Sequence, residues 1–115
     1  MLKMYGIPNC DTIKKARVWL KDHSVDYEFH DYKKLGVSQE LLEKWMKLVD
    51  WEILLNRRGM MWRKLDDAQK ENIDQASAIT IMMETPSIIK RPVLEVTGSK
   101  ILVGFKESEY EKLLG

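Results

Sequence analysis

The residue best suited to covalent chemistry is Cys10, the only cysteine among the 115 residues of the chain. It lies in the stretch YGIPNCDTIKK, directly before a segment with the pattern of a helix. The N-terminus of a helix favours anions, and a thiol placed there can have its pKa lowered from about 8.5 to roughly 3.5–7.5. This position predicts a reactive thiolate, whereas free cysteines are commonly buried and inert. Position alone leaves both interpretations of Cys10 open.

The polar residues around Cys10 are candidates for stabilising a thiolate or binding an anionic substrate. The Thr12 hydroxyl and the Asn9 side chain can each donate a hydrogen bond, which would favour the charged form of the thiol. Lys14 and Lys15 add positive potential in the same stretch. We therefore predict a site around Cys10 that includes Asn9, Thr12 and Lys14.

A second candidate is Arg91, which precedes Pro92 at the start of a predicted strand. Arginine is well suited to bidentate contact with an oxyanion or a carboxylate. The peptide bond before a proline can adopt the cis form at little cost. The alternative interpretation is a surface arginine at the beginning of an edge strand.

A third candidate is the run LLNRRGMMWRKL, in which basic residues surround an aromatic one. Its basic residues are Arg57, Arg58, Arg63 and Lys64, and its aromatic residue is Trp62. Such a grouping can hold an anion or stack on a base. A solvated basic turn is the alternative interpretation for a stretch this short.

The composition argues against several other kinds of site and partner. The formal net charge is +1, without the basic excess typical of nucleic-acid-binding proteins. One cysteine cannot form an internal disulfide, and with only His23 and His30 it makes no zinc-binding pattern. The N-terminus lacks the apolar core of a signal peptide, and no apolar run approaches the roughly 20 residues that span a bilayer. We expect a cytoplasmic protein without a metal, a tightly bound cofactor, or direct contact with nucleic acid or membranes.

The first part of the chain has the pattern of a βαβ unit. A short apolar strand is predicted at 2–6, a helix at 11–23 and a half-exposed strand at 25–32. The residues expected on the inner face of the helix, from their spacing, are Ile13, Ala16, Arg17 and Leu20. Strands joined by a helix in this way are parallel, with a right-handed crossover.

The last part of the chain returns to strands. Segments 92–96 and 100–105 predict an antiparallel hairpin around a turn at 97–99. A helix follows at 106–115, and its inward residues are expected to be Tyr110, Leu113 and Leu114.

A helical insertion at about 38–85 separates these two parts. It is expected to begin with a helix capped by Ser38, to continue with a short helix that ends at Gly59, and to close with two helices before Pro86. The predicted fold class is α/β: one thioredoxin-like domain over 1–115, with a four-stranded mixed sheet in the order βαβ…ββα.

Four stretches in this order resemble the arsenate reductase (ArsC)/Spx family, most closely its YffB-like branch of ArsC-related reductases. They are YGIPNCDTIKKARVWL, FHDYKKLG, LLNRRGMMWRKLD, and PSIIKRPVLEV followed by LVGF. The resemblance implies a thioredoxin-like fold, Cys10 as the catalytic thiolate, and Arg91 beside it before a cis Pro92. It also implies an oxidoreductase that attacks an oxyanion or a glutathione mixed disulfide.

The sequence departs from parts of this family in ways that bear on the reaction. Glutaredoxin-linked arsenate reductases place an arginine where this chain has Asn56, and Arg58 is the better match to the YffB and Spx branches. Near VGFKES, where a further arginine is expected, the nearest basic residue is Lys106. Whether arsenate is the substrate therefore stays open.

The resemblance also bears on the partners. Spx-type regulators generally carry a C-x-x-C switch, and this chain has Ile13 at the second position. The second thiol would then come from glutathione or glutaredoxin, with Asn9, Thr12, Lys14, Arg58 and Pro92 as the glutathione-binding or substrate-binding residues. The alternative is an Spx-like regulatory protein that binds RNA polymerase.

Overall fold

The computed structural model describes residues 2–97 and 99–114, which form two compact units. One unit consists of the residues up to Leu35 and from Arg91 onward, and the other of residues 36–90. The prediction that the whole chain is a single domain stays a prediction.

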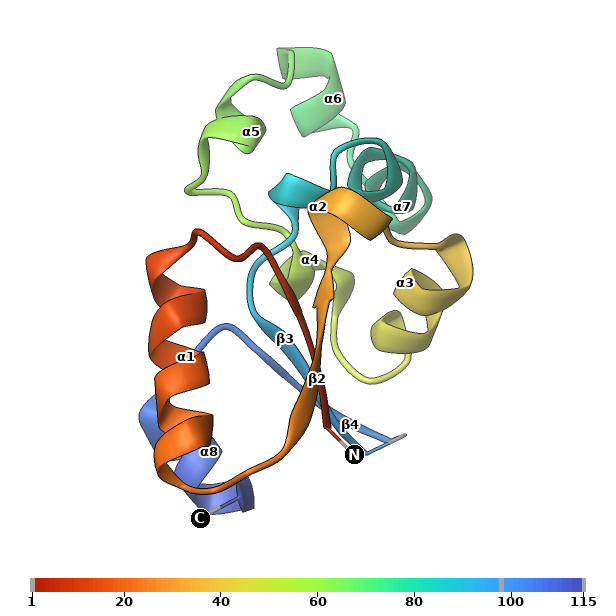
Figure 1. Cartoon of the computed structure of the whole chain (residues 1–115). Helices are drawn as coiled ribbons and strands as arrows, with labels where there is room; N and C mark the ends of the chain where they lie inside the picture. Colours follow the sequence, from red (N-terminus) through yellow and green to blue (C-terminus); the bar gives the residue numbers. More distant parts are fainter. Residues whose placement is uncertain (1, 98, 115) are drawn as a thin grey trace. The chain divides into compact units, whose positions relative to one another are not determined.

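The unit formed by the chain ends contains a four-stranded mixed sheet (Figure 1). Its strands are β1 (Leu2–Gly6), β2 (Tyr27–Asp31), β3 (Val93–Thr97) and β4 (Lys100–Val103), in the spatial order β2-β1-β3-β4. β1 runs parallel to β2 and antiparallel to β3, and β3 runs antiparallel to β4. The predicted βαβ unit and hairpin are confirmed, although the turn at 97–99 contains residue 98, which lies outside the described residues.

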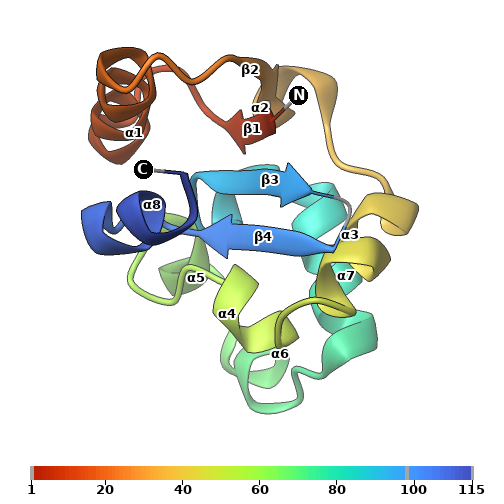
Figure 2. The same cartoon turned by 90° about the horizontal axis from the view of Figure 1, so that it is seen from below.

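Two helices, α1 (Asp11–Asp22) and α8 (Glu107–Leu114), pack on the same face of this sheet (Figure 2). The core between them consists of Met4, Leu94 and Leu102 from the strands, Ile13, Ala16, Trp19 and Leu20 from α1, and Tyr110 from α8. The short helix α2 (Tyr32–Leu35) follows β2 directly and contacts β1 and β2. The strand predicted at 25–32 is therefore shorter, because Tyr32 begins a helix.

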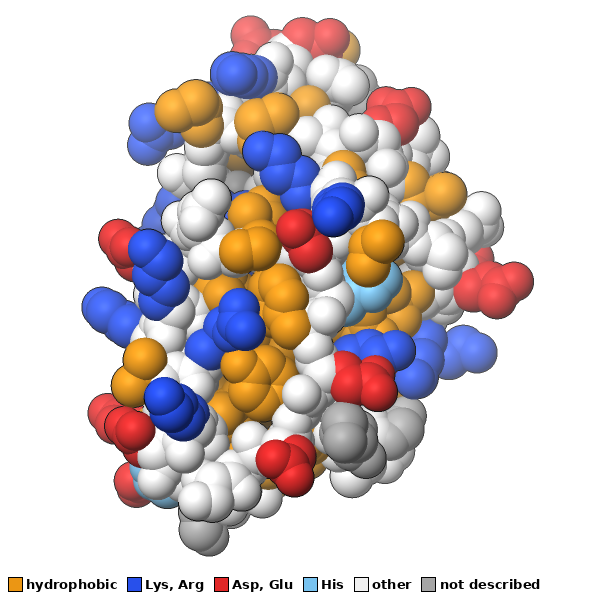
Figure 3. Space-filling view, in the orientation of Figure 1, with side chains coloured by type: hydrophobic (Ala, Val, Ile, Leu, Met, Phe, Trp, Pro, Cys, Tyr) orange, Lys and Arg blue, Asp and Glu red, His pale blue; other side chains and the backbone are white. Residues whose placement is uncertain are grey.

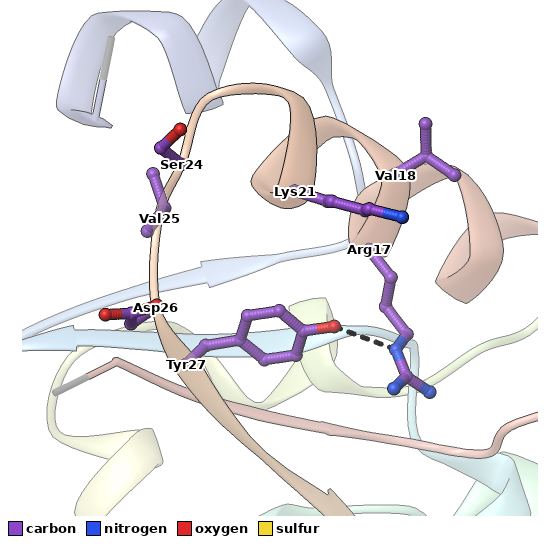
Figure 4. A pocket seen from close by; sticks show the side chains of 7 residues that line it. All are labelled: Arg17, Val18, Lys21, Ser24, Val25, Asp26 and Tyr27. Carbon is purple, nitrogen blue, oxygen red and sulfur yellow. Dashed lines mark hydrogen bonds between the residues drawn. The ribbon is translucent and has the colours of Figure 1, made fainter.

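Two predicted core positions are wrong. Leu113 is 40% exposed because α8 turns it to solvent, while Tyr110 is fully buried as expected. Arg17 is exposed, and Trp19 takes the inner position in its place. The Arg17 side chain instead reaches β2, where its Nε donates a hydrogen bond of 2.8 Å to the Tyr27 hydroxyl (Figure 4).

The second unit is helical, which confirms the predicted insertion. Its helices are α3 (Gln39–Met46), α4 (Trp51–Leu54), α5 (Met60–Arg63), α6 (Asp67–Glu71), α7 (Gln75–Glu84) and the 3₁₀ turn η1 (Pro86–Ile88). Ser38 caps α3 as predicted, since its hydroxyl oxygen accepts a hydrogen bond of 3.1 Å from the N–H of Leu41.

The prediction that the helix after Asp50 continues to Gly59 is wrong. α4 ends at Leu54 because the next residue, Leu55, is extended and forms an antiparallel bridge with Ile89. The Lys90 N–H donates to the Leu54 carbonyl oxygen at 2.7 Å on one side of this bridge. Gly59 has an extended backbone instead, and it precedes the first residue of α5. Among the helices in the described part of the chain, none has the length and apolar character needed to cross a bilayer.

Candidate active site

Cys10 occupies the N-cap position of α1, in the loop that follows β1. Its backbone is extended (φ −97°, ψ 132°), and its carbonyl oxygen accepts the first helical hydrogen bond, 3.0 Å from the N–H of Lys14. The side chain is partly exposed, and the thiol is free. A solvent-accessible thiol at an open helix end differs from the inert, fully buried cysteine that the sequence had left as an alternative.

The surroundings of Cys10 lower the pKa of its thiol. Partial burial is the largest influence and acts to raise the pKa, but the N–H of Ile13, the Arg91 guanidinium and the N–H of Thr12 together outweigh it. No regular capping hydrogen bond joins the Cys10 side chain to the described residues of the helix, yet the N–H groups of Ile13 and Thr12 still favour the thiolate. The site thus favours the nucleophilic form of cysteine.

The fold brings Arg91 beside Cys10 although the two are far apart in the sequence. β1 ends at Gly6, shortly before Cys10, and the antiparallel strand β3 begins at Val93, which pairs with Tyr5 near that end. The residues just before β3 therefore lie at the same edge of the sheet as the Cys10 loop. The Arg91–Pro92 peptide bond is cis, as the family resemblance implied.

Arg91 keeps its positive charge in this setting. Its partial burial acts to lower the guanidinium pKa, but the Cys10 thiol and the Tyr32 phenol raise it more strongly. A charged guanidinium next to the thiol can stabilise the thiolate and hold an oxyanion or carboxylate that approaches it.

Tyr32 is the third member of this cluster, and it was not among the predicted site residues. It is fully buried at the start of α2, where the Arg91 guanidinium donates a hydrogen bond to its hydroxyl oxygen. The signal that would have found it is the parallel pairing of β1 and β2, in which Gly6 lies opposite Asp31. Because parallel strands end at the same edge, the residue after Asp31 belongs to the same side of the sheet as the Cys10 loop.

Three further predicted site residues, Asn9, Thr12 and Lys14, lie next to Cys10 in the sequence. The prediction was that the Thr12 hydroxyl would stabilise the thiolate. In the structure it is the backbone N–H of Thr12 that lowers the pKa of the Cys10 thiol. Asn9 and Lys14 are exposed residues on either side of Cys10 in the loop and the first turn of α1. Their roles in substrate binding stay predictions.

Arg58 belongs to the other compact unit, in the loop between α4 and α5. Its backbone N–H donates to the Asn56 side-chain oxygen at 3.3 Å, and its side chain is exposed. The neighbouring Arg57 pairs with Glu52 at 3.2 Å and lies 5.3 Å from the centre of the Trp62 ring. A role of Arg58 in binding a substrate or glutathione stays a prediction.

Several basic side chains lie on the α1 side of the molecule (Figure 3). The basic residues of α1 are Lys14, Lys15, Arg17 and Lys21. A hollow of about 470 Å³ lies between the later turns of α1 and the start of β2, with the Arg17, Lys21 and Tyr27 side chains around it (Figure 4). Cys10 and Arg91 do not line this hollow. In the part of the chain that the structure describes, no group of three or more His, Cys, Asp and Glu residues is arranged to hold a metal ion.

Comparison with known proteins agrees with this fold. The model of the ArsC family matches residues 5–113 of the chain. An uncharacterised protein of Haemophilus influenzae is 40% identical over 111 residues, which cover 96% of each chain. The global transcriptional regulator Spx of Streptococcus pyogenes is 26% identical over 116 residues, covering 99% of this chain and 85% of the regulator.

Two solved structures extend the comparison. The YffB protein is 50% identical, covers 100% of both chains and superposes with a TM-score of 0.95. A protein of Brucella melitensis described as related to arsenate reductase (ArsC) is 53% identical, with a TM-score of 0.79 and coverage of 96% of this chain and 92% of that one. The predicted resemblance and the predicted thioredoxin-like α/β fold are confirmed.

Proposed function

Because the chain belongs to the ArsC family, we propose that it is a glutathione-dependent thiol reductase whose reaction begins with the Cys10 thiolate. The observation that carries the proposal is the partly exposed thiol at the start of α1, with a lowered pKa and the charged Arg91 beside it. Neighbours that favour the thiolate are what a cysteine nucleophile needs near neutral pH.

With a glutathione mixed disulfide as substrate, the Cys10 thiolate attacks the glutathione sulfur. A bond forms between Cys10 and glutathione, the original disulfide bond breaks, and its electron pair leaves on the substrate thiolate, which takes a proton from solvent. The thiolate of a second glutathione, or of a glutaredoxin, then attacks the glutathione sulfur held on Cys10. Oxidised glutathione or a glutathionylated glutaredoxin leaves, and the Cys10 thiolate is restored.

An oxyanion such as arsenate is the second substrate class. Attack by the thiolate on arsenic would release one oxygen as water and leave arsenic bonded to the Cys10 sulfur. Glutathione would then attack that sulfur, so that arsenic leaves with the electron pair as the reduced oxyanion and a Cys10–glutathione disulfide remains. Both routes pass through the same Cys10–glutathione disulfide, which a further external thiol then resolves to restore the Cys10 thiolate. Both therefore draw two electrons from external thiols.

The need for an external thiol follows from the residue at position 13. Ile13 stands in the first turn of α1, where a C-x-x-C pair would place its second cysteine, and it is fully buried in the core. Cys10 is also the only cysteine of the chain. Glutathione carries carboxylates, and we propose Asn9, Thr12, Lys14, Arg58, Arg91 and Pro92 as the residues that bind it or the substrate.

A second candidate function is an Spx-like regulator that binds RNA polymerase. The observation in its favour is the similarity to Spx of Streptococcus pyogenes over 99% of this chain. Ile13 argues against an internal disulfide switch and leaves protein binding open. Specific retention of purified RNA polymerase on the immobilised protein would favour this function.

The test of the reductase is a titration of Cys10 by its alkylation rate against pH, followed by mass spectrometry after incubation with oxidised glutathione. We expect a midpoint below about 8.5, the usual value for a free thiol, and one glutathione per chain. Replacement of Arg91 by Ala should raise the midpoint, because a charge that stabilises the thiolate is lost. Arg17→Ala is the matched control. The Arg17 side chain donates a hydrogen bond to the Tyr27 hydroxyl, so its removal should leave the midpoint of the Cys10 titration unchanged. A midpoint at or above about 8.5 without a glutathione adduct would refute the proposal.

A further inference from the structure

Tyr32 places a phenol against Arg91, an arginine that acts on the Cys10 thiol. Its side chain is fully buried, and its hydroxyl oxygen accepts a hydrogen bond from the Arg91 guanidinium. The cluster joins three separate parts of the chain: Cys10 before α1, Tyr32 at the start of α2, and Arg91 before β3. Each part follows the end of β1 or β2, or precedes the beginning of β3, at one edge of the sheet.

The partner of the Tyr32 hydroxyl is specific to this position. Tyr110 is also fully buried, but its hydroxyl has no hydrogen-bond partner among the described residues. An unpaired buried hydroxyl costs about 1–3 kcal/mol, and at Tyr110 the fold tolerates this cost. Burial of a phenol does not therefore require a guanidinium partner such as the one Tyr32 has. The hydrogen bond from Arg91 to the hydroxyl of a fully buried side chain restrains the orientation of the guanidinium.

A phenol restrains an arginine without neutralising it. Burial raises the pKa of Tyr32 to about 12, although Arg91 acts in the opposite direction. Tyr32 is therefore neutral at physiological pH, and the positive charge of Arg91 stays available to an anion. A carboxylate in its place would pair with the guanidinium and cancel that charge.

Asp31, the residue before Tyr32, is an acidic neighbour that makes hydrogen bonds elsewhere. One carboxylate oxygen of Asp31 accepts hydrogen bonds from the N–H groups of Lys33 and Lys34, at 3.1 Å and 3.3 Å. Asp31 thus satisfies the open N–H groups of α2. The same short helix presents the neutral Tyr32 hydroxyl to Arg91.

We infer that Tyr32 is a positioning residue, which holds the Arg91 guanidinium beside the Cys10 sulfur while leaving its charge free for the thiolate and for an anionic substrate. This inference rests on the proposed thiol chemistry. It adds a residue that does not touch the reacting atoms and acts through Arg91.

The test is Tyr32→Phe, which removes only the hydroxyl, with Tyr110→Phe as the matched control. We expect Tyr32→Phe to lower the acid dissociation constant of the Cys10 thiol about three- to tenfold, the effect of one hydrogen bond, and Tyr110→Phe to leave it unchanged. In an Arg91→Ala background the effect of Tyr32→Phe should vanish, because the residue through which it acts is gone. An unchanged dissociation constant in folded Tyr32→Phe, or an equal decrease with and without Arg91, would overturn the inference.

A second measurement needs no substitution and guards against a variant that does not fold. In the NMR spectrum of the unmodified protein, the guanidinium protons of Arg91 should give separate signals, as expected for a restrained group. Those of the exposed Arg58 should be averaged by rotation. Averaged Arg91 signals would contradict the inference, whereas a lowered Cys10 pKa and a glutathione adduct in the same sample would still support the reductase itself.

Discussion

At the scale of single residues, Cys10 and its neighbours divide the chemistry between groups of different charge. In the proposed reaction Cys10 supplies the nucleophile, while the N–H groups of Thr12 and Ile13 favour its thiolate and Arg91 adds a full positive charge. Tyr32 contributes a neutral hydroxyl. Because none of these neighbours is a thiol, the thiolate can react with an external disulfide without being trapped by its own chain.

The adjacent residues Arg57 and Arg58 offer a test of substrate binding at this scale. Both side chains are exposed, and Arg57 is paired with Glu52 and lies near the Trp62 ring. We expect Arg58→Ala to raise the KM for glutathione about two- to fivefold, the effect of one exposed charge contact, without changing the Cys10 titration. Arg57→Ala should instead lower the free energy of unfolding by at most about 1 kcal/mol, as for a surface ion pair. Equal KM values for the two variants would remove Arg58 from the binding site.

Cys10 and Arg91 could be predicted from the sequence as neighbours, whereas Tyr32 could not. Cysteine and arginine carry chemistry that is visible in a sequence, and the X–Pro bond marked the position of Arg91. Tyr32 looked like the last residue of an alternating strand. Its role depends on the pairing of β1 with β2 and on a hydrogen bond to a residue before β3, and neither is visible without the fold.

At the scale of elements, the end of β1 and the first turn of α1 fit together closely at Gly6 and Ile13. A Cβ atom added to Gly6 would overlap the Cδ1 atom of Ile13 and lie 3.1 Å from its Cγ1. Ile13 is fully buried, and its N–H is one of the groups that favour the Cys10 thiolate. The small residue at the strand end therefore allows the first turn of the helix to approach the sheet.

Gly6→Ala should lower the free energy of unfolding by about 1–3 kcal/mol, since an added methyl group in a packed core forces side chains to shift. Urea denaturation measures this change. Ile13→Val removes the Cδ1 atom that the new methyl group would meet, so Gly6→Ala should cost less when it is introduced into Ile13→Val. An equal cost in both backgrounds would show that the overlap with Ile13 is not the cause.

Local patterns predicted the elements well where they reflect periodicity and capping. The strand at β1, the helix α1, the Ser38 cap and the final hairpin follow from the sequence. The errors at α4 and Arg17 have a tertiary cause. Leu55 is extended and pairs with Ile89, a residue distant in the sequence. Arg17 donates a hydrogen bond to the Tyr27 hydroxyl on another element, β2.

At the scale of the whole molecule, the two ends of the chain together supply the cluster of Cys10, Tyr32 and Arg91. Cys10, Tyr32 and Arg91 all belong to the unit formed by the residues up to Leu35 and from Arg91 onward. The 36–90 unit interrupts the sequence between Tyr32 and Arg91, so the cluster exists only when both ends of the chain pair in one sheet. Loss of the sheet should therefore abolish the lowered Cys10 pKa together with the fold.

Because several tyrosines are buried, the free energy of unfolding should depend on pH in the alkaline range. The pKa of Tyr32 is raised by burial to about 12, and burial also raises the pKa values of Tyr5 and Tyr110. A folded-state pKa above the unfolded value stabilises the protein below the unfolded value, which is about 10 for tyrosine, and this stabilisation is lost as the pH rises through the folded value. The Cys10 thiol has the opposite sign: its lowered pKa contributes stability above the unfolded value of about 8.5, and that contribution is lost as the pH falls through the folded value.

We therefore expect the free energy of unfolding to fall between pH 10 and 12. Tyr32 should account for at most about 2–3 kcal/mol of this fall. Urea denaturation of the wild type and of Tyr32→Phe at several pH values measures it, and the difference between the two proteins should change across this interval because phenylalanine cannot ionise. Cys10→Ser serves as the control, since it removes the thiol contribution and should leave the alkaline fall in place. The contrary result is a difference in the free energy of unfolding between wild type and Tyr32→Phe that stays constant from about pH 9 to about pH 12. It would mean that the Tyr32 hydroxyl ionises as easily in the folded chain as in the unfolded one. The complete burial of Tyr32 beside Arg91 argues against that result.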